Sequence, residues 1–209
     1  MRQAGLFLMI AGVALLLLMA WPYVDHVRKQ HAALDEAHAR LSEMNPIAKE
    51  NFLTDGFSSA AAPSVGEPAD PLPAVEFTAA DGEVVGLLVV PKLDKELPLV
   101  EGADEESLAM GVGHVARTAY PGQGDQIVVS GHRDTVFTRF GELDIGDTFV
   151  VRMPYGDFEY RIHHTRIVSA DDLTVIGPTG EEELVVTTCY PFHALAHATE
   201  RFIFYAVPR

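Results

Sequence analysis

The sequence predicts a mainly β fold, an antiparallel or mixed barrel with one or two short helices, preceded by an N-terminal transmembrane helix. Residues 3–24 carry no formal charge. Beyond residue 82, short apolar and β-branched runs alternate with turn signals. No long helical segments separate these runs, so the crossover helices that a parallel α/β sheet requires are missing. With 209 residues, the chain has room for one compact domain and appendages.

The composition excludes several classes of protein. Hydrophobic residues make up 48% of the chain and charged residues 22%, so a sizeable core can form and wholesale disorder is excluded. Lys and Arg number 15 against 30 Asp and Glu, and the net charge of −15 argues against binding to nucleic-acid phosphates. The single cysteine permits no intrachain disulfide and no Cys-rich zinc site.

Residues 1–24 are predicted to form an uncleaved transmembrane signal-anchor. A helix over the uncharged run is roughly 33 Å long, enough to cross a bilayer core of about 30 Å. Trp21 and Tyr23 lie at its end, where aromatic rings favour the membrane interface. A cleaved secretory signal is the alternative, but the run is long for one and lacks a small-x-small cleavage site. Basic residues flank both ends, so charge alone does not fix the orientation.

Two segments of different composition follow. Residues 25–50 are rich in Ala, Leu, Glu, His and Arg, and we expect a polar helical stalk in solvent, with a self-associating coiled segment as the alternative. Residues 51–82 form a Pro-, Ala- and Ser-rich linker that is expected to be extended and semi-rigid. The folded domain is then expected over residues 83–209.

Within this domain, strands are expected where apolar runs are bounded by turn residues. The clearest signal is a hairpin, in which residues 148–153 and 158–167 flank Pro-Tyr-Gly-Asp. A short helix is expected over residues 104–110, because its first turn is acidic and this complements the helix dipole. The other expected strands are residues 84–90, 97–100, 126–130, 173–176, 184–188 and 202–207.

Three residues at predicted strand ends form a candidate acyl-transfer set. Cys189 ends one strand, His132 directly follows another, and Arg201 begins the last one. A thiolate nucleophile, an imidazole that exchanges protons and a guanidinium that holds an oxyanion suffice for this chemistry. Each residue also has a structural interpretation, namely an inert buried thiol, a turn residue and a surface charge. Spacing alone does not bring the three together.

The segments around these residues resemble the sortase family. They are Ser-Gly-His-Arg-Asp-Thr at residues 130–135 and Thr-Thr-Cys-Tyr-Pro-Phe at residues 187–192, with Arg201 placed 12 residues after the cysteine. The resemblance covers residues 84–208 in order, and the Cys-Tyr-Pro continuation is most similar to class D.

One position departs from the family pattern. The pattern before the nucleophile is Thr-Leu-x-Thr-Cys, whereas this chain has Val185 and Val186 at the first two positions. Thr188 is kept beside the cysteine, and the resemblance implies a substrate-binding role for it.

The resemblance implies an eight-stranded sortase β-barrel and a cysteine transpeptidase that needs no cofactor. Cys189, with His132 and Arg201 as the other catalytic residues, would cleave a sorting signal similar to Leu-Pro-x-Thr-Gly after the threonine. The thioacyl enzyme would then pass the protein to an amine of peptidoglycan or its precursor. This chemistry implies a single-pass membrane protein of a Gram-positive cell with its catalytic domain on the cell-wall side. At the reference pKa near 8.5, only about 3% of a thiol is ionised at pH 7.

Two other functions stay open at this stage. One is a cysteine peptidase or hydrolase that releases the acyl group to water. The other is a membrane-tethered binding barrel whose cysteine is inert.

The remaining histidines give no metal-binding pattern, and no metal is predicted. His114 follows a Gly-Val-Gly turn and could border the cleft. His163 and His164 alternate within a predicted strand, while His193 and His197 lie in the loop after the nucleophile. The acidic runs lack the spacing of a calcium-binding loop, so a solvated face is expected rather than a Ca²⁺ site.

Overall fold

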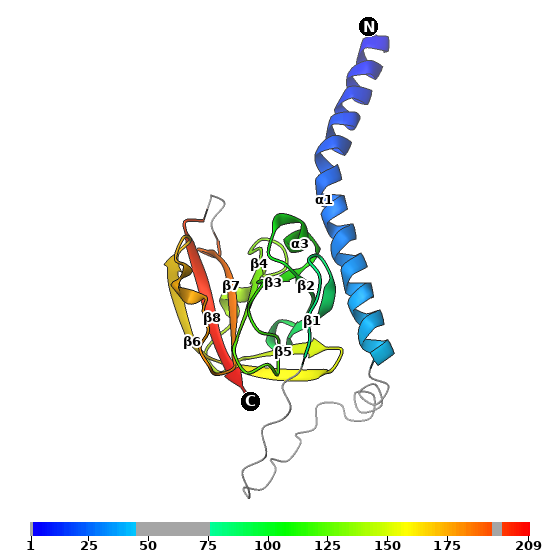
Figure 1. Ribbon diagram of the computed structural model, residues 1–209. Helices are drawn as coiled ribbons and strands as arrows, with labels where there is room; N and C mark the ends of the chain where they lie inside the picture. Colours follow the sequence, from blue (N-terminus) through cyan, green and yellow to red (C-terminus); the bar gives the residue numbers. More distant parts are fainter. Residues whose placement is uncertain (1, 45–75, 194–197) are drawn as a thin grey trace, which may run out of the picture.

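The computed structural model describes residues 2–44, 76–193 and 198–209. Eight strands form a closed barrel in the order β1-β2-β3-β4-β7-β8-β6-β5 (Figure 1), which confirms the predicted barrel. Two neighbouring pairs, β2–β3 and β4–β7, are parallel and the other six are antiparallel. The strands are β1 (Val84–Val90), β2 (Lys95–Glu101), β3 (Val112–His114), β4 (Gln126–Gly131), β5 (Thr148–Met153), β6 (Gly156–Ser169), β7 (Glu183–Tyr190) and β8 (Glu200–Pro208).

Short helical turns join some of these strands. They are η1 (Pro91–Leu93), α3 (Glu105–Met110), η2 (Phe140–Glu142) and η3 (Leu173–Val175). Helix α3 begins where it was predicted, because the Asp104 side chain accepts hydrogen bonds from two backbone N–H groups of the first turn.

The strand expected at residues 173–176 is wrong. This segment forms η3, whose first turn is capped by the Asp172 carboxylate, an acceptor for Thr174 N at 2.9 Å. The Leu173 side chain is 75% exposed, so the apolar run does not mark a buried strand here.

The loop after β4 contributes to the core of the barrel. Phe137 and Phe140 are fully buried, and their ring centroids lie 4.0 Å apart. The Phe137 ring covers Gly131, where a Cβ atom would come within 2.6 Å of it. A glycine is therefore required at position 131, because the Phe137 ring leaves no room for a side chain there. This packing holds the loop that carries His132 against the core.

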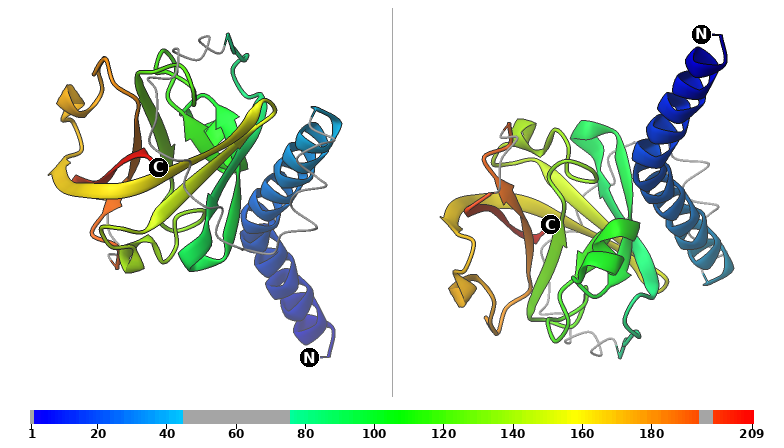
Figure 2. Two further views of the ribbon diagram at one scale, coloured as in Figure 1. Left: turned by 90° about the horizontal axis from the view of Figure 1, so that it is seen from below. Right: turned by 90° about the horizontal axis from the view of Figure 1, so that it is seen from above.

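Helix α1 (Arg2–Met44) lies along the outside of the barrel, and its N-terminal part extends beyond it (Figures 1 and 2). Ala33 and Ala37 are buried against β1 and β2, where Leu87 and Val100 belong to the same apolar cluster. The small alanines allow the helix to approach the sheet closely. The described part of the stalk expected over residues 25–50 is helical, and one face of it packs on the barrel while most of its other residues stay exposed.

The transmembrane helix expected over residues 1–24 is not confirmed. In the described part of the chain, no helix combines the length and hydropathy that a membrane crossing needs. Most of the predicted linker, residues 51–75, lies outside the described residues.

Candidate active site

The barrel brings the three predicted catalytic residues to one end of neighbouring strands. Strand β7 lies between β4 and β8, and Cys189 is paired with Arg201 across the antiparallel β7–β8 ladder. On the other side, Gly131 of β4 is paired with Thr188 in parallel register. His132 directly follows Gly131, so the backbone places it beside Cys189. In the order of the strands, Cys189 thus lies between His132, which follows β4, and Arg201, which lies at the start of β8.

The contact between Arg201 and Cys189 is direct. Arg201 Nη1 donates to Cys189 Sγ at 3.3 Å, and the same nitrogen lies 3.4 Å from the Glu200 carbonyl oxygen. Cys189 and Arg201 are partly exposed and His132 is exposed, so a substrate can reach all three. A guanidinium beside the sulfur can stabilise both a thiolate and an oxyanion formed next to it.

Thr188, for which a substrate-binding role was predicted, is buried beside the nucleophile. Its side chain is 1% exposed, and its hydroxyl donates to the Gly131 carbonyl oxygen at 2.8 Å. The hydroxyl therefore joins the ends of β4 and β7, directly before His132 and Cys189. In this structure the Thr188 side chain therefore stabilises the strand ends next to His132 and Cys189, and its contact with substrate stays a prediction.

Arg133 is the residue at this site that the sequence interpretation missed. It follows the exposed His132, yet it is only 8% exposed. Its guanidinium forms a two-pronged contact with Asp134, and Nη1 donates to the Pro191 carbonyl oxygen at 2.7 Å. The hydrogen bond and charge of Arg133 lower the pKa of the Asp134 carboxyl. The sequence does contain one indication of this role, since Arg133 and Asp134 are adjacent and come just after a predicted buried strand.

Aromatic side chains surround the segment that contains Cys189. The Phe192 ring lies 5.0 Å from the Phe202 ring and 5.7 Å from the Tyr190 ring, measured between centroids. Phe192 also packs on Gly141 of η2, where a Cβ atom would come within 2.9 Å of the ring. The chain after the nucleophile is thus packed against the loop that follows His132.

His114 does not border the active site. It lies in β3 with 1% exposure, and Nδ1 is 2.6 Å from Glu101 Oε2. The Tyr120 hydroxyl donates to the same carboxylate oxygen at 2.5 Å, and burial together with Glu101 raises the pKa of Tyr120. These three residues form a buried polar network that joins β2, β3 and the following loop.

The other histidines considered above have contacts of their own, are exposed, or lie outside the described residues. The exposed His163 has Nε2 3.0 Å from Glu183 Oε1, and the His164 ring lies 5.7 Å from the Tyr205 ring in a tilted arrangement. His193 is exposed, and His197 lies outside the described residues. Within the described ranges, no three His, Cys, Asp or Glu side chains come together as metal ligands.

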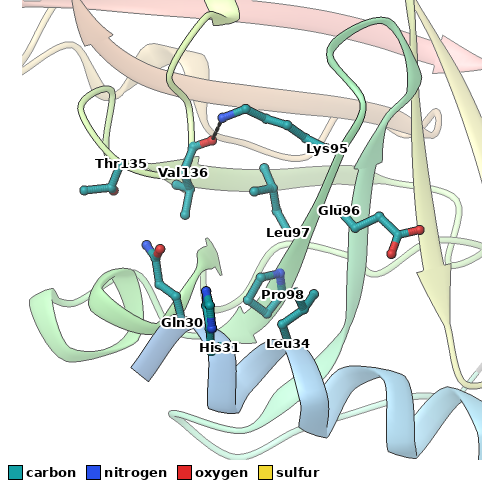
Figure 3. Close-up of a pocket in the computed structure, with 9 residues that line it drawn as sticks. All are labelled: Gln30, His31, Leu34, Lys95, Glu96, Leu97, Pro98, Thr135 and Val136. Atoms are coloured by element: carbon teal, nitrogen blue, oxygen red, sulfur yellow. Dashed lines mark hydrogen bonds between the residues drawn. The ribbon is translucent and has the colours of Figure 1, made fainter. Parts of the chain in front are cut away.

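A groove of about 250 Å³ lies between α1 and the barrel (Figure 3). It is lined by Gln30, His31 and Leu34 of the helix, by residues 95–98 of β2, and by Thr135 and Val136 of the loop after His132. Lys95 Nζ donates to the Val136 carbonyl oxygen at 2.8 Å. The groove does not include the thiol, but it borders the loop that positions the histidine.

Comparisons with known proteins agree with this geometry. The family model described as "Sortase domain" matches residues 88–209. Sortase D of Bacillus subtilis (strain 168) is 37% identical over 201 residues, which cover 96% of this chain and 94% of that protein. Sortase A of Bacillus anthracis is 24% identical over about half of each chain.

Two solved structures of sortases are also similar to this chain. The catalytic domain of Bacillus anthracis SrtD has a TM-score of 0.55 at 39% identity, covering 65% of this chain and 93% of that one. A Clostridium perfringens Sortase D5 transpeptidase shares the fold with a TM-score of 0.65 at 19% identity, covering 87% and 99%. Together with the single cysteine at the end of β7, these matches show that the chain belongs to the sortase family of cysteine transpeptidases, in class D.

Proposed function

We propose that this protein cleaves a Leu-Pro-x-Thr-type sorting signal after its threonine and joins the released protein to an amine of the cell wall. The observation that carries the proposal is the placement of Cys189 between His132 and Arg201, with Arg201 Nη1 3.3 Å from the sulfur. The similarity to Sortase D over almost the whole chain supports the same chemistry.

In the first step, the Cys189 thiolate attacks the carbonyl carbon of the threonine residue, and the C=O electron pair moves to the oxygen. Arg201 N–H groups donate to this oxyanion. When the tetrahedral intermediate collapses, the C–N bond breaks, and the departing amine takes a proton from the His132 imidazolium. The product is a thioester between the threonine carbonyl and Cys189.

In the second step, an acceptor amine attacks the thioester carbonyl. His132 takes the proton from the attacking nitrogen, and the thiolate leaves as the new amide forms. The partly exposed thiol admits both the sorting signal and the second substrate.

A single peptide experiment tests the proposal. A Leu-Pro-x-Thr-Gly peptide is incubated with the enzyme, with and without an added amine, and products are identified by mass. We expect the amide of the added amine to dominate when the amine is present. Formation of the free acid alone would identify a hydrolase, while loss of all cleavage in Cys189→Ala with an unchanged circular dichroism spectrum would support the assigned nucleophile.

We further propose that residues 1–24 anchor the protein in the membrane, with the barrel on the cell-wall side. The support is the uncharged run of residues 3–24, which ends in Trp21 and Tyr23, both largely exposed on the outside of α1. Fractionation tests this proposal: the full chain should pellet with membranes, and a chain lacking residues 1–24 should be soluble and active. A full chain found in the soluble fraction would refute the anchor.

A further inference from the structure

We propose that Arg133 is a positioning residue for the transpeptidation, because its buried guanidinium ties the segment after Cys189 to the loop that carries His132. This inference rests on the proposed function of the site. It assigns no contact with substrate to Arg133 itself.

The burial of Arg133 is the first observation. Its side chain is 7% exposed, whereas the neighbouring Asp134 side chain is 73% exposed. A buried guanidinium loses its hydration and must recover it through hydrogen bonds within the protein. An arginine that only provides surface charge would lie in solvent.

The use of its donors is the second observation. Nε and Nη2 donate to the two carboxylate oxygens of Asp134 at 2.7 and 3.1 Å, which fixes the plane of the guanidinium. This plane directs Nη1 at the Pro191 carbonyl oxygen, 2.7 Å away. Asp134 thus orients the arginine, and the arginine in turn holds a carbonyl two residues after the nucleophile.

The position of this bond in the barrel is the third observation. The ladder between β4 and β7 ends at the pair Gly131–Thr188, where the Thr188 hydroxyl also donates to the Gly131 carbonyl oxygen. The Arg133–Pro191 bond and the packing of Phe192 on Gly141 continue the connection beyond the strands. Cys189 lies between these two sets of contacts, so its distance from His132 depends on both.

An electrostatic effect on the thiol does not by itself account for the burial and the hydrogen bonds of Arg133. The Asp134 hydrogen bond, rather than the thiol, is the main cause of the raised pKa of Arg133. The charge of Cys189 is the smallest of the causes that raise the pKa of Arg133, whereas Arg201 contacts the sulfur directly. The role that fits the geometry is placement of the thiol.

The test uses Arg133→Met, which keeps an apolar stem but has no donors, and Arg139→Met as a matched control. Arg139 belongs to the same loop and also pairs with a carboxylate, that of Glu142, but it is exposed on the outside. Since a misplacement of about 1 Å can cost about 10² in rate, we expect Arg133→Met to lower the rate of thioacyl formation about 10²-fold with little change in KM. Arg139→Met should stay within about threefold of the wild type, because exposed ion pairs contribute little.

Arg133→Lys separates placement from charge. An ammonium keeps the charge but does not hold a carboxylate in two-pronged fashion while reaching a second acceptor. We expect this variant to be close to Arg133→Met. Wild-type rates in either Arg133→Met or Arg133→Lys would overturn the proposal. If Arg133→Met does not fold, as judged by circular dichroism, Arg133→Lys alone decides.

A second readout does not depend on the proposed function. The rate of Cys189 alkylation by iodoacetamide is measured from about pH 5 to 9, across the ordinary pKa range of His and Cys. We expect the pH profile of Arg133→Met to change, because the thiol is displaced from its partners, while that of Arg139→Met is unchanged. An unchanged profile for Arg133→Met would overturn the positioning role. Altered alkylation in a protein whose wild type cleaves no sorting peptide would instead contradict the proposed function and leave the positioning role intact.

Discussion

Arg201 and Cys189 face each other across the β7–β8 ladder, and the guanidinium donates to the sulfur at 3.3 Å. Two contacts of Arg201 Nη1, with the sulfur and with the Glu200 carbonyl oxygen, orient the guanidinium relative to the thiol. Donors with a set orientation suit an oxyanion, which forms at one position. Stabilising the Cys189 thiolate through charge alone would not require such an orientation.

The first prediction concerns this pair. Arg201→Lys should lose nearly as much activity as Arg201→Ala, since an ammonium is a point charge on a flexible stem and misplaces the donor. We expect both variants to fall by about 10²–10³ in the rate of thioacyl formation, with Lys within about tenfold of Ala. The measurement is the single-turnover rate from about pH 6 to 9. A lysine variant with a near-normal rate and only a shifted pH optimum would mean that Arg201 acts through charge.

The second prediction concerns Thr188. Thr188→Val keeps the shape of the side chain but leaves the Gly131 carbonyl oxygen without this donor, and such a loss typically costs about 1–3 kcal/mol of unfolding free energy. The rate of thioacyl formation should fall as well, because the ends of β4 and β7 are no longer joined. The control is Thr187→Val, since successive side chains of a strand point to opposite faces. Urea denaturation and single-turnover rates check both effects; equal behaviour of the two variants would contradict the role of Thr188.

A third prediction concerns the docked part of α1. Ala37→Leu should reduce the unfolding free energy by about 1–3 kcal/mol, because Ala37 is fully buried and a larger side chain overpacks the contact with the barrel. Ala39→Leu, on the exposed face of the same helix, should have little effect. A stability of Ala37→Leu equal to that of Ala39→Leu, measured by chemical denaturation, would show that the helix does not dock in solution.

Truncation gives a fourth prediction. A chain lacking residues 1–24 keeps the docked part of α1 and should remain monomeric in size-exclusion chromatography. A chain lacking residues 1–44 exposes Val84, Leu87 and Val100, which are buried in the cluster that includes the helix, and should be less stable or aggregate. Identical melting temperatures for the two truncated chains would contradict the packing.

A fifth prediction concerns acid pH and Asp125. The backbone N–H groups of Thr179, Gln126 and Gly180 donate to this carboxylate and lower its pKa. Because the pKa of Asp125 is lower in the folded state, the ionised carboxylate stabilises the fold at pH values above its unfolded-state pKa of about 3.9. This stabilisation is lost as the pH falls through the pKa of the folded state. Asp125→Asn should therefore lower the melting temperature at pH 7, with a difference from the wild type that shrinks below about pH 4. Asp94→Asn, in an exposed turn, is the control.

Several features of the fold follow from local pattern, and others do not. Strands β1 and β5 have the predicted bounds because their apolar runs end at clear turn signals. Strand β3 was missed, since three residues carry no periodicity and the strand depends on parallel pairing with β2. The docked face of α1 was also missed. Its buried residues are Ala33 and Ala37, and Leu34 and Leu41 pack beside them. The two leucines alone form only a narrow apolar stripe, and the small alanines do not widen it enough to indicate burial.

In the candidate site, too, some features could be predicted from the local sequence and others depend on the fold. Cys189, His132 and Arg201 were identified because each residue type has a chemical role and each stands at a strand end. Their meeting depended on the order of β4, β7 and β8 in the barrel, which joins residues far apart in sequence. Arg133 was missed because an arginine is expected in solvent, and only the fold shows that the Pro191 carbonyl lies within its reach.

The docked helix also orients the barrel relative to residues 1–24. Helix α1 is continuous from Arg2 to Met44, and at 1.5 Å per residue Ala33 lies about 14 Å along the axis from Val24. The end of the barrel where β7 ends and β8 begins faces the same way as the N-terminus of α1 (Figure 1). If residues 1–24 lie in a bilayer, as proposed above, the barrel end that contains Cys189 and Arg201 would be on the membrane side. Substrates would then be selected by how far their sorting signal stands from the membrane, as well as by its sequence.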